Sequence, residues 1–295
     1  MLMNWKRKND KAMKKLFLFA LFATLCCGCS ESGTDENADS DQGQNNVDQV
    51  DLYTIHVPKK GTLAAVLDEK DLNAEMIVLL KITGELNDED FITIQSMTNL
   101  IEIDLLEVNL PILFGHAFYG NKMIKKVTLP ENLETIENSA FCDCESLTTI
   151  EMPAGSLEAI GDYAFWNCKS LTSIEMPKVE TIGNYAFKGC KSLKTVTFGS
   201  DVGQIGSYAF AGTAIATVDM SQCGRGNITI GERAFSECSK LQLFKIGTSV
   251  PPCCKGYAFW MINPYSLLKV PSGSIDAYKA ASGWEDFANI SGLDE

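Results

Sequence analysis

The sequence predicts an α/β solenoid, with about nine parallel strands on a concave sheet and short helices or irregular turns on the convex side. An Ala-Phe pair recurs seven times between residues 117 and 259, with steps of 22 to 25 residues. Nine short segments also alternate apolar and polar residues with the period of two that marks a strand. Because a unit this short cannot bury its own apolar face, each unit must stack on its neighbours.

Each strand is predicted from two apolar positions that are separated by one residue and point to the same side. The pairs are Leu80/Ile82, Ile103/Leu105, Val127/Leu129, Ile150/Met152, Ile174/Met176, Val196/Phe198, Val218/Met220, Phe244/Ile246 and Leu268/Val270. Parallel strands lie roughly 4.8 Å apart, so nine of them make a sheet on the order of 40 Å long. The Ala-Phe stretch is too short for a long helix, and its Phe is expected to fill the space between the sheet and the convex side.

The repeat unit approximates the pattern IGxYAFxxCxxLxxIxMP. It is most complete at Ile160, Gly161, Tyr163, Ala164, Phe165, Cys168, Leu171, Ile174, Met176 and Pro177. This unit resembles the repeats of the BspA-like leucine-rich repeat proteins of bacterial cell surfaces, over about residues 50–295. The resemblance implies a right-handed leucine-rich repeat fold and an adhesive function, with extracellular-matrix proteins as the partners of some members. It supplies no motif of binding residues that transfers to this chain.

A solenoid needs a terminal unit with a polar outer face at each end, which covers the apolar core of the last coil. At the N-terminal end, TLAAVL from Thr62 predicts a short helix, and DEDFITIQSM predicts a second helix entered at Asp88. At the C-terminal end, Ser274 is the expected N-cap of a last helix, and Tyr278 and Trp284 are expected to cover the final coil. The predicted domain spans residues 52–295, with an N-terminal cap and first rungs at 52–110, repeats at 111–270 and a C-terminal cap at 271–295.

Residues 1–28 are predicted to be a signal peptide. A stretch with six basic residues precedes the apolar run from Leu16 to Leu25, which is far shorter than the ~20 residues of a membrane span. Because the segment from Met13 is a complete signal by itself, the start of the chain is either Met1 or Met13.

The end of this segment resembles a bacterial lipobox, in which a small residue precedes a cysteine that carries lipid. Gly28 and Cys29 fit those two positions, although Cys26 stands where the motif usually has Leu. We therefore expect lipid on Cys29, with Cys27 as the alternative. Residues 29–51 contain no Lys or Arg and almost no large apolar residue, so they are predicted to be a disordered acidic tether.

Without residues 1–28 the chain holds 19 basic and 37 acidic residues, a net charge of −18, of which −7 lies between Glu31 and Asp51. Phosphate binding requires clustered cations, so nucleic acid is not an expected partner. An acidic tether resembles the sorting signal that sends lipoproteins to the outside of the outer membrane. We therefore expect a lipid-anchored protein of the outer membrane, exposed at the cell surface, with the periplasmic leaflet as the alternative.

One cysteine position recurs three residues after the repeat Phe. It is occupied by Cys144, Cys168, Cys190 and Cys238, with Thr213 in the fifth unit. A single Cys per repeat at an apolar position indicates a packing role, so we expect a buried ladder of free thiols, with disulfides between rungs as the alternative. Outside this register lie Cys142, Cys223, Cys253 and Cys254. No two C-x-x-C pairs exist that would indicate a zinc site.

The sequence does not predict an enzyme, a metal site or a cofactor. The two histidines, His56 and His116, lie near no recognisable nucleophile, and His116 occupies the repeat position usually held by Tyr. Glu151 and Glu175 lie on adjacent predicted rungs, and their carboxylates could approach ~5 Å, the separation used by retaining glycosidases. A flat sheet lacks the enclosed pocket that would separate their pKa values, so we expect no catalysis there; cation binding by the pair is an alternative.

The polar residues between the buried strand positions are expected to form a floor that is rich in Thr and Ser, acidic in the middle and basic toward the C-terminal end. The candidate ligand-binding residues are Thr149, Glu151, Ser173, Glu175, Thr195, Thr197, Thr217, Asp219 and Lys245. One alternative is a solvated face without a ligand. Another is the convex side, where Tyr recurs before the Ala-Phe pair and where Trp166 and Trp260 follow it.

These observations together predict a non-enzymatic surface lipoprotein that binds an extracellular protein or glycan through the concave face of its repeats. The alternative is a structural or accessory subunit of a surface complex, which would present a hydrophobic patch instead of a polar floor.

Overall fold

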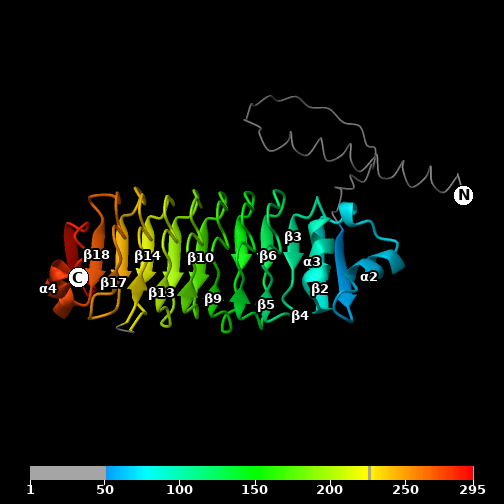
Figure 1. The fold of residues 1–295 in the computed structure, drawn as a ribbon, viewed down its shortest axis with the longest axis horizontal. Helices are drawn as coiled ribbons and strands as arrows, with labels where there is room; N and C mark the ends of the chain where they lie inside the picture. Colours follow the sequence, from blue (N-terminus) through cyan, green and yellow to red (C-terminus); the bar gives the residue numbers. More distant parts are fainter. Residues whose placement is uncertain (1–50, 225–226, 295) are drawn as a thin grey trace, which may run out of the picture. The chain divides into compact units, whose positions relative to one another are not determined.

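The computed structural model describes residues 51–224 and 227–294 (Figure 1). The predicted signal peptide, the lipidation site Cys29 and nearly all of the tether lie outside these residues. The described residues belong to one compact unit in which similar coils stack on one another. Each repeat coil has three walls: a strand of a long row, a two-residue strand of a second sheet, and a turn.

The strand wall is a row of eleven parallel strands that form two sheets. The first sheet contains β1 (Leu52–Val57), β2 (Leu79–Glu85), β3 (Glu102–Asp104), β6 (Lys126–Thr128) and β8 (Thr149–Glu151), and β4 (Val108–Asn109) pairs with the end of β2. The remaining strands of the row, in a sheet of their own, are β10 (Ser173–Met176), β12 (Thr195–Phe198), β14 (Thr217–Met220), β16 (Leu243–Ile246), β18 (Leu267–Val270) and β19 (Asn289–Gly292). The nine predicted rungs are β2 to β18 of this row, which confirms the solenoid; β1 and β19 add one unpredicted strand at each end.

A second parallel sheet forms another wall of the repeats and was not predicted. It contains β5 (Ile112–Leu113), β7 (Thr135–Ile136), β9 (Ala159–Ile160), β11 (Thr181–Ile182), β13 (Gln204–Ile205), β15 (Thr229–Ile230) and β17 (Cys253–Cys254). Each strand has only two residues, so no alternation of apolar and polar positions marks it in the sequence. In strands such as β9 and β11, the buried residue is the Ile that precedes Gly in the repeat pattern, here Ile160 and Ile182.

The turn wall follows the second sheet and contains the Ala-Phe pair. Two residues of each turn, four positions apart, have positive φ: His116/Gly120, Ser139/Asp143, Tyr163/Asn167, Tyr185/Gly189, Tyr208/Gly212, Arg233/Glu237 and Tyr257/Met261. This conformation is uncommon outside Gly. Successive turns are hydrogen-bonded, since the Phe141 N–H donates to the Ala164 carbonyl at 2.8 Å and the Phe165 N–H donates to the Ala186 carbonyl at 2.7 Å. The turns therefore form an irregular wall that is nonetheless bonded from coil to coil.

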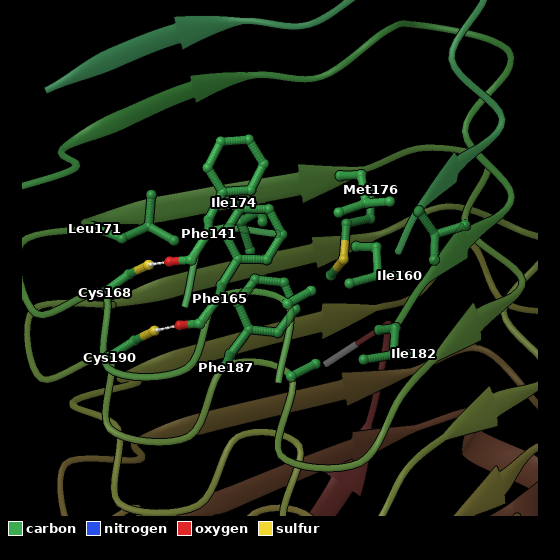
Figure 2. Close-up of a cluster of buried hydrophobic side chains, with 14 of the residues drawn as sticks. Phe141, Ile160, Phe165, Cys168, Leu171, Ile174, Met176, Ile182, Phe187 and Cys190 are labelled. Atoms are coloured by element: carbon green, nitrogen blue, oxygen red, sulfur yellow. Dashed lines mark hydrogen bonds between the residues drawn. The ribbon is translucent and has the colours of Figure 1, made fainter. Parts of the chain in front are cut away.

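The Phe of each Ala-Phe pair lies in the core between the three walls (Figure 2). The stacked rings are Phe118, Phe141, Phe165, Phe187, Phe210, Phe235 and Phe259. Neighbouring ring centroids lie 5.0 to 5.6 Å apart, and the ring planes differ by 3° to 9°. This spacing is about that of parallel strands, so the ring stack and the sheets share one repeat distance.

The predicted ladder of small buried side chains runs beside the ring stack. The Cys168 thiol donates to the Phe141 carbonyl of the preceding coil at 3.1 Å, and the Cys190 thiol donates to the Phe165 carbonyl at 3.1 Å (Figure 2). In the fifth unit the Thr213 hydroxyl occupies the same place, but it donates to a carbonyl of its own coil at 2.8 Å. All of these cysteines are free and buried. Burial raises the pKa of the Cys190 thiol to about 12.

Caps cover both ends of the ring stack. The helical segments are α2 (Leu63–Glu69), η1 (Ala74–Met76), α3 (Asp88–Gln95), η2 (Ser272–Ser274) and α4 (Ile275–Ala280). Phe91 of α3 packs edge-on against Phe118, and Trp284 and Phe287 pack against Phe259. Thr62 and Ser274 stand at the predicted N-cap positions, but neither side chain makes a capping hydrogen bond. The helix α3 has a full capping box, formed by Asn87 and Asp90.

Within residues 51–224 and 227–294, no helix is both long and apolar enough to cross a membrane.

Candidate binding face

The outward side chains of β2 to β18 form a surface that we call the strand face. Its first column contains Lys81, Asp104, Thr128, Glu151, Glu175, Thr197, Asp219, Lys245 and Lys269. Its second column contains Leu79, Glu102, Lys126, Thr149, Ser173, Thr195, Thr217, Leu243 and Leu267. The pairing within each sheet gives the register expected from the sequence, and all nine candidate ligand-binding residues lie on this face.

Lysines neutralise part of the predicted acidic middle. Lys126 Nζ lies 2.7 Å from Glu151 Oε1, and Lys245 Nζ lies 3.6 Å from Asp219 Oδ2. The Thr128 hydroxyl also donates to Glu151 Oε2 at 2.8 Å. The hydrogen bond from Lys126, followed by that from Thr128, lowers the pKa of Glu151. Both ion pairs join residues on neighbouring strands and were not foreseen from the sequence.

Among the three acidic candidates, Glu151 and Asp219 each pair with a lysine and Glu175 does not. Burial of Asp219 opposes ionisation, but hydrogen bonds from the Ser221 hydroxyl and N–H, together with Lys245, give a net lowering of its pKa. Glu175 is exposed and forms no ion pair with any described residue. Among the three acidic candidates, Glu175 therefore contributes most to the negative potential of the middle of the strand face, where the sequence indicated three equivalent carboxylates.

Hydroxyl groups dominate the middle of the strand face. The residues are Thr149, Ser173, Thr195, Thr197 and Thr217, of which the first three are exposed and the last two are half-buried. Ser173 pairs with Thr195, and Thr195 pairs with Thr217, so their side chains follow one another along the second column. Hydroxyl side chains both donate and accept hydrogen bonds and have few rotamers to order. This part of the face is thus suited to a polar ligand.

The strand face is interrupted between β8 and β10. The Thr148 N–H donates to the Lys125 carbonyl at 2.9 Å, and the Lys194 N–H donates to the Thr172 carbonyl at 2.9 Å. These bonds join β6 to β8 and β10 to β12. No strand pairing joins β8 to β10, although the second sheet continues through β7, β9 and β11. Glu151 and Glu175 lie on opposite sides of this break. Glu151 also bonds to Lys126 of the preceding strand, an interaction that Glu175 does not share.

The repeat region matches the family model described as "BspA type Leucine rich repeat region", in six copies over residues 94–212 and 158–278. These spans together cover more than half of the chain. The chain belongs to this family.

Several solved structures are similar to this BspA-type chain. A leucine rich repeat protein of T. pallidum is 29% identical over 50% of this chain and 66% of its own, with a TM-score of 0.41. The pneumococcal vaccine antigen PcpA is 19% identical over 73% of this chain and 51% of its own, with a TM-score of 0.44. A leucine rich cell surface protein from Faecalibacterium prausnitzii is 17% identical over 81% of this chain and 83% of its own, with a TM-score of 0.33.

The chain spans about half to two thirds of the length of the first two of these structures. A comparison with curated proteins found no similar sequence. Membership of the BspA-type family favours a repeat protein for binding over an enzyme.

In this BspA-type repeat, the Tyr before the Ala-Phe pair forms a second stack on the turn wall. The rings of Tyr163, Tyr185 and Tyr208 lie 4.9 and 5.0 Å apart. Arg233 holds the next position, where its guanidinium lies 5.9 Å from the Tyr208 ring centroid, 5.7 Å from that of Tyr257 and 5.0 Å from that of Trp260. The cation thus continues the stack by cation–π contact. Ring packing accounts for these tyrosines, although Tyr163 at the end of the stack is 41% exposed; Tyr119 of the first turn and Tyr257 of the last turn are 51% and 66% exposed.

The remaining predicted chemistry lies outside the strand face. His116 is exposed on the first turn, beside Tyr119 at a ring distance of 5.4 Å, and His56 contacts the Thr83 hydroxyl at 3.0 Å. In the described part of the chain, no group of three or more His, Cys, Asp or Glu residues is arranged to hold a metal ion. A shallow hollow of about 260 Å³ lies between α3 and the first turn, lined by Gln95 and Tyr119 among others. No predicted site residue contributes to it.

Proposed function

We propose that this BspA-type protein is a non-enzymatic adhesion or binding protein that recognises an extracellular protein or glycan through the middle of its strand face. One observation carries the proposal: the hydroxyl groups of β8 to β14 form a regular polar surface, and the unpaired carboxylate of Glu175 lies among them. A standard interface buries ~800 Å² on each partner, and a row of parallel strands is the widest rigid surface that a repeat coil offers.

The character of the surface indicates the kind of ligand. Lys126 and Lys245, which lie on either side of the hydroxyl-rich middle of the face, are already engaged in ion pairs, so they are poor determinants of specificity. Thr and Ser hydroxyls accept and donate without much loss of side-chain entropy. A polyhydroxylated ligand or a basic protein segment fits such hydroxyls beside the free carboxylate of Glu175.

We further propose that the protein is held at the outer face of the outer membrane by lipid on Cys29. The support is the signal-like segment that ends in Gly28 and Cys29, followed by an acidic stretch without Lys or Arg. A tether of about 22 residues allows the binding face to stand away from the membrane.

The test is charge reversal on the strand face. Glu175→Lys, alone and with Glu151→Lys, is expected to weaken binding to a partner isolated from a glycan array or a panel of host matrix proteins at least tenfold. The melting temperature should be preserved, because both side chains are exposed. Glu158→Lys is the matched control, since Glu158 is an exposed carboxylate beside the second sheet. The proposal is wrong if the double variant binds normally and Trp166→Ala or Trp260→Ala abolishes binding.

A second candidate function, an accessory subunit of a surface complex, is favoured by the last turn. Tyr257, Met261 and Tyr265 are 66%, 60% and 82% exposed, and together they make an apolar patch at the C-terminal end of the turn wall. The chain reaches β19 from Gly283 in six residues, a route too short to form another turn over this patch. Replacing all three residues with Ser should abolish assembly into a surface complex and leave ligand binding by the strand face unchanged, since only the accessory role requires the patch.

A further inference from the structure

The break between β8 and β10 leaves backbone groups without partners in the middle of the strand face. In seven other steps of the wall, the N–H just before a strand, or at its first residue, donates to the preceding coil at 2.7 to 2.9 Å. At the break, the corresponding bond from the Thr172 N–H to the Thr148 carbonyl is missing. The Leu129 N–H, just after β6, donates to the Glu151 carbonyl of the next coil at 3.1 Å. The equivalent N–H after β8, that of Met152, has no such bond within the described residues.

The separation is confined to the strand wall. The Phe141 and Phe165 rings of the same two coils are 5.0 Å apart, the same distance as in neighbouring coils, and β9 and β11 remain paired. Ile150 of β8 and Met152, which directly follows β8, are only partly buried, whereas Met176, the counterpart of Met152 in the next coil, is 1% exposed. The two coils are therefore in contact at the ring stack and at the second sheet, and they are separated at the strand face.

The length of the link after β8 does not by itself explain this parting. The link from Met152 to the buried Ile160 of the second sheet has two more residues than the link from Met176 to Ile182. The link from Met220 to Ile230 is longer still, yet β14 remains paired with β16. Thr148 and Thr172 are exposed, so water or a ligand can reach these unpaired backbone groups.

The geometry limits what that partner is. An inserted polypeptide strand would need about 4.8 Å of additional spacing between the coils. The ring stack and the second sheet hold the coils at a single step, so a strand cannot enter. Hydroxyl groups are small and both donate and accept, so they can satisfy a carbonyl on one side and an N–H on the other. Water meets these requirements in the free protein, and a sugar does so in a complex.

We propose that the break is the anchoring point of a glycan on the strand face, an inference that rests on the proposed function and names its ligand class. Sugar hydroxyls donate to the Thr148 carbonyl and to the carboxylate of Glu175, and they accept from the Thr172 N–H. The exposed hydroxyls of Thr149 and Ser173, on either side of the break, bond to the same ring. The free carboxylate disfavours acidic sugars, so the ligand is a neutral or amino-containing oligosaccharide.

The experiment combines an array of neutral, amino and acidic oligosaccharides with amide hydrogen exchange on residues 52–295. In the free protein, the Thr172 amide is expected to exchange at least tenfold faster than the Lys194 amide, which is bonded to the preceding coil. A bound neutral oligosaccharide should slow exchange at Thr172 and leave Lys194 unchanged. Thr149→Ala combined with Ser173→Ala should weaken that oligosaccharide at least tenfold. Thr181→Ala, an exposed threonine of the second sheet, should have less than a twofold effect and serves as the control.

Three results would overturn the inference. Equal exchange at Thr172 and Lys194 in the free protein would show that the break is closed. Glycan binding that protects only β12 and β14 would place the ligand elsewhere on the strand face and leave the proposed function standing. Failure to bind any oligosaccharide, with Glu175→Lys still abolishing capture of a matrix protein, would show that the face serves a protein and not a glycan.

Discussion

Replacing Met176 with Asp tests the register of the strand wall. Met176 points into the core from β10 and is 1% exposed, between the ring stack and the second sheet (Figure 2). Removal of its apolar side chain costs about 1.5 to 3 kcal/mol of burial. The new carboxyl has no cation within the core, so it must be protonated; at pH 7 this costs about 4 kcal/mol for a group whose ordinary pKa is near 3.9. The expected loss of unfolding free energy is therefore about 6 kcal/mol.

The pH dependence of this loss identifies its cause. The folded state raises the pKa of the new carboxyl, so the folded state binds more protons than the unfolded state and stability falls as pH rises above about 3.9. The protonation cost shrinks from about 4 kcal/mol at pH 7 to about 1.5 kcal/mol at pH 5. Urea unfolding of both proteins at the two pH values, followed by circular dichroism, measures the difference.

Two control variants separate charge from shape. Met176→Leu keeps an apolar side chain of similar volume and should cost less than about 1.5 kcal/mol. Glu175→Asp changes the adjacent residue on the outward side and should be nearly neutral, because Glu175 is exposed. Wild-type-like unfolding of Met176→Asp at pH 7 would refute the assignment of Met176 to the inward face, and a loss that does not change with pH would refute the electrostatic account.

Three further outcomes are expected. Metabolic labelling with a palmitate analogue should mark the wild type and not Cys29→Ser, and label retained on that variant would contradict the assigned lipidation site. Hydrogen bonds from two lysines lower the pKa of Glu145 to about 2, so the stabilisation that Glu145→Gln removes should be present above pH 4.5 and disappear as pH falls toward 2, as thermal melting across pH can show. Gly199→Ala should cost more than about 1 kcal/mol in urea unfolding, because a Cβ there would overlap the Pro177 carbonyl, whereas Gly256→Ala has open space and should be tolerated.

The sequence predicted the features that depend on repetition. The inward positions of the nine rungs, the stack of Phe side chains and the Cys ladder recur at one spacing, so each unit reinforces the assignment of the next. The caps were predicted from apolar residues such as Trp284, which is 1% exposed and covers the last coil as expected. The second sheet was missed because strands such as Thr181–Ile182 are too short to show a period.

The candidate site was predicted less completely, because its properties depend on contacts between strands. The outward residues were correctly placed, but the sequence does not show which carboxylates meet a lysine. Lys126 reaches Glu151 on the next strand, and Glu175 is left alone across the break. The loss of strand pairing at the break is not marked in the sequence, because Met220 is followed by a longer link and β14 still pairs with β16. The place of Arg233 between two tyrosines also requires the register of the turn wall.

The thiol ladder has a consequence for the chemical reactivity of the molecule. Disulfide exchange proceeds through the thiolate, and burial raises the pKa of Cys144 and Cys190 to about 12 and that of Cys238 to about 11. At neutral pH roughly one in 10⁴ to 10⁵ of these groups is ionised, so buried sulfurs in neighbouring coils exchange too slowly to become cross-linked. Neighbouring coils are joined here by weak S–H donors to carbonyls, and all the described cysteines are free thiols. Among the described cysteines, Cys253 is exposed, so oxidants and alkylating reagents should modify that sulfur first.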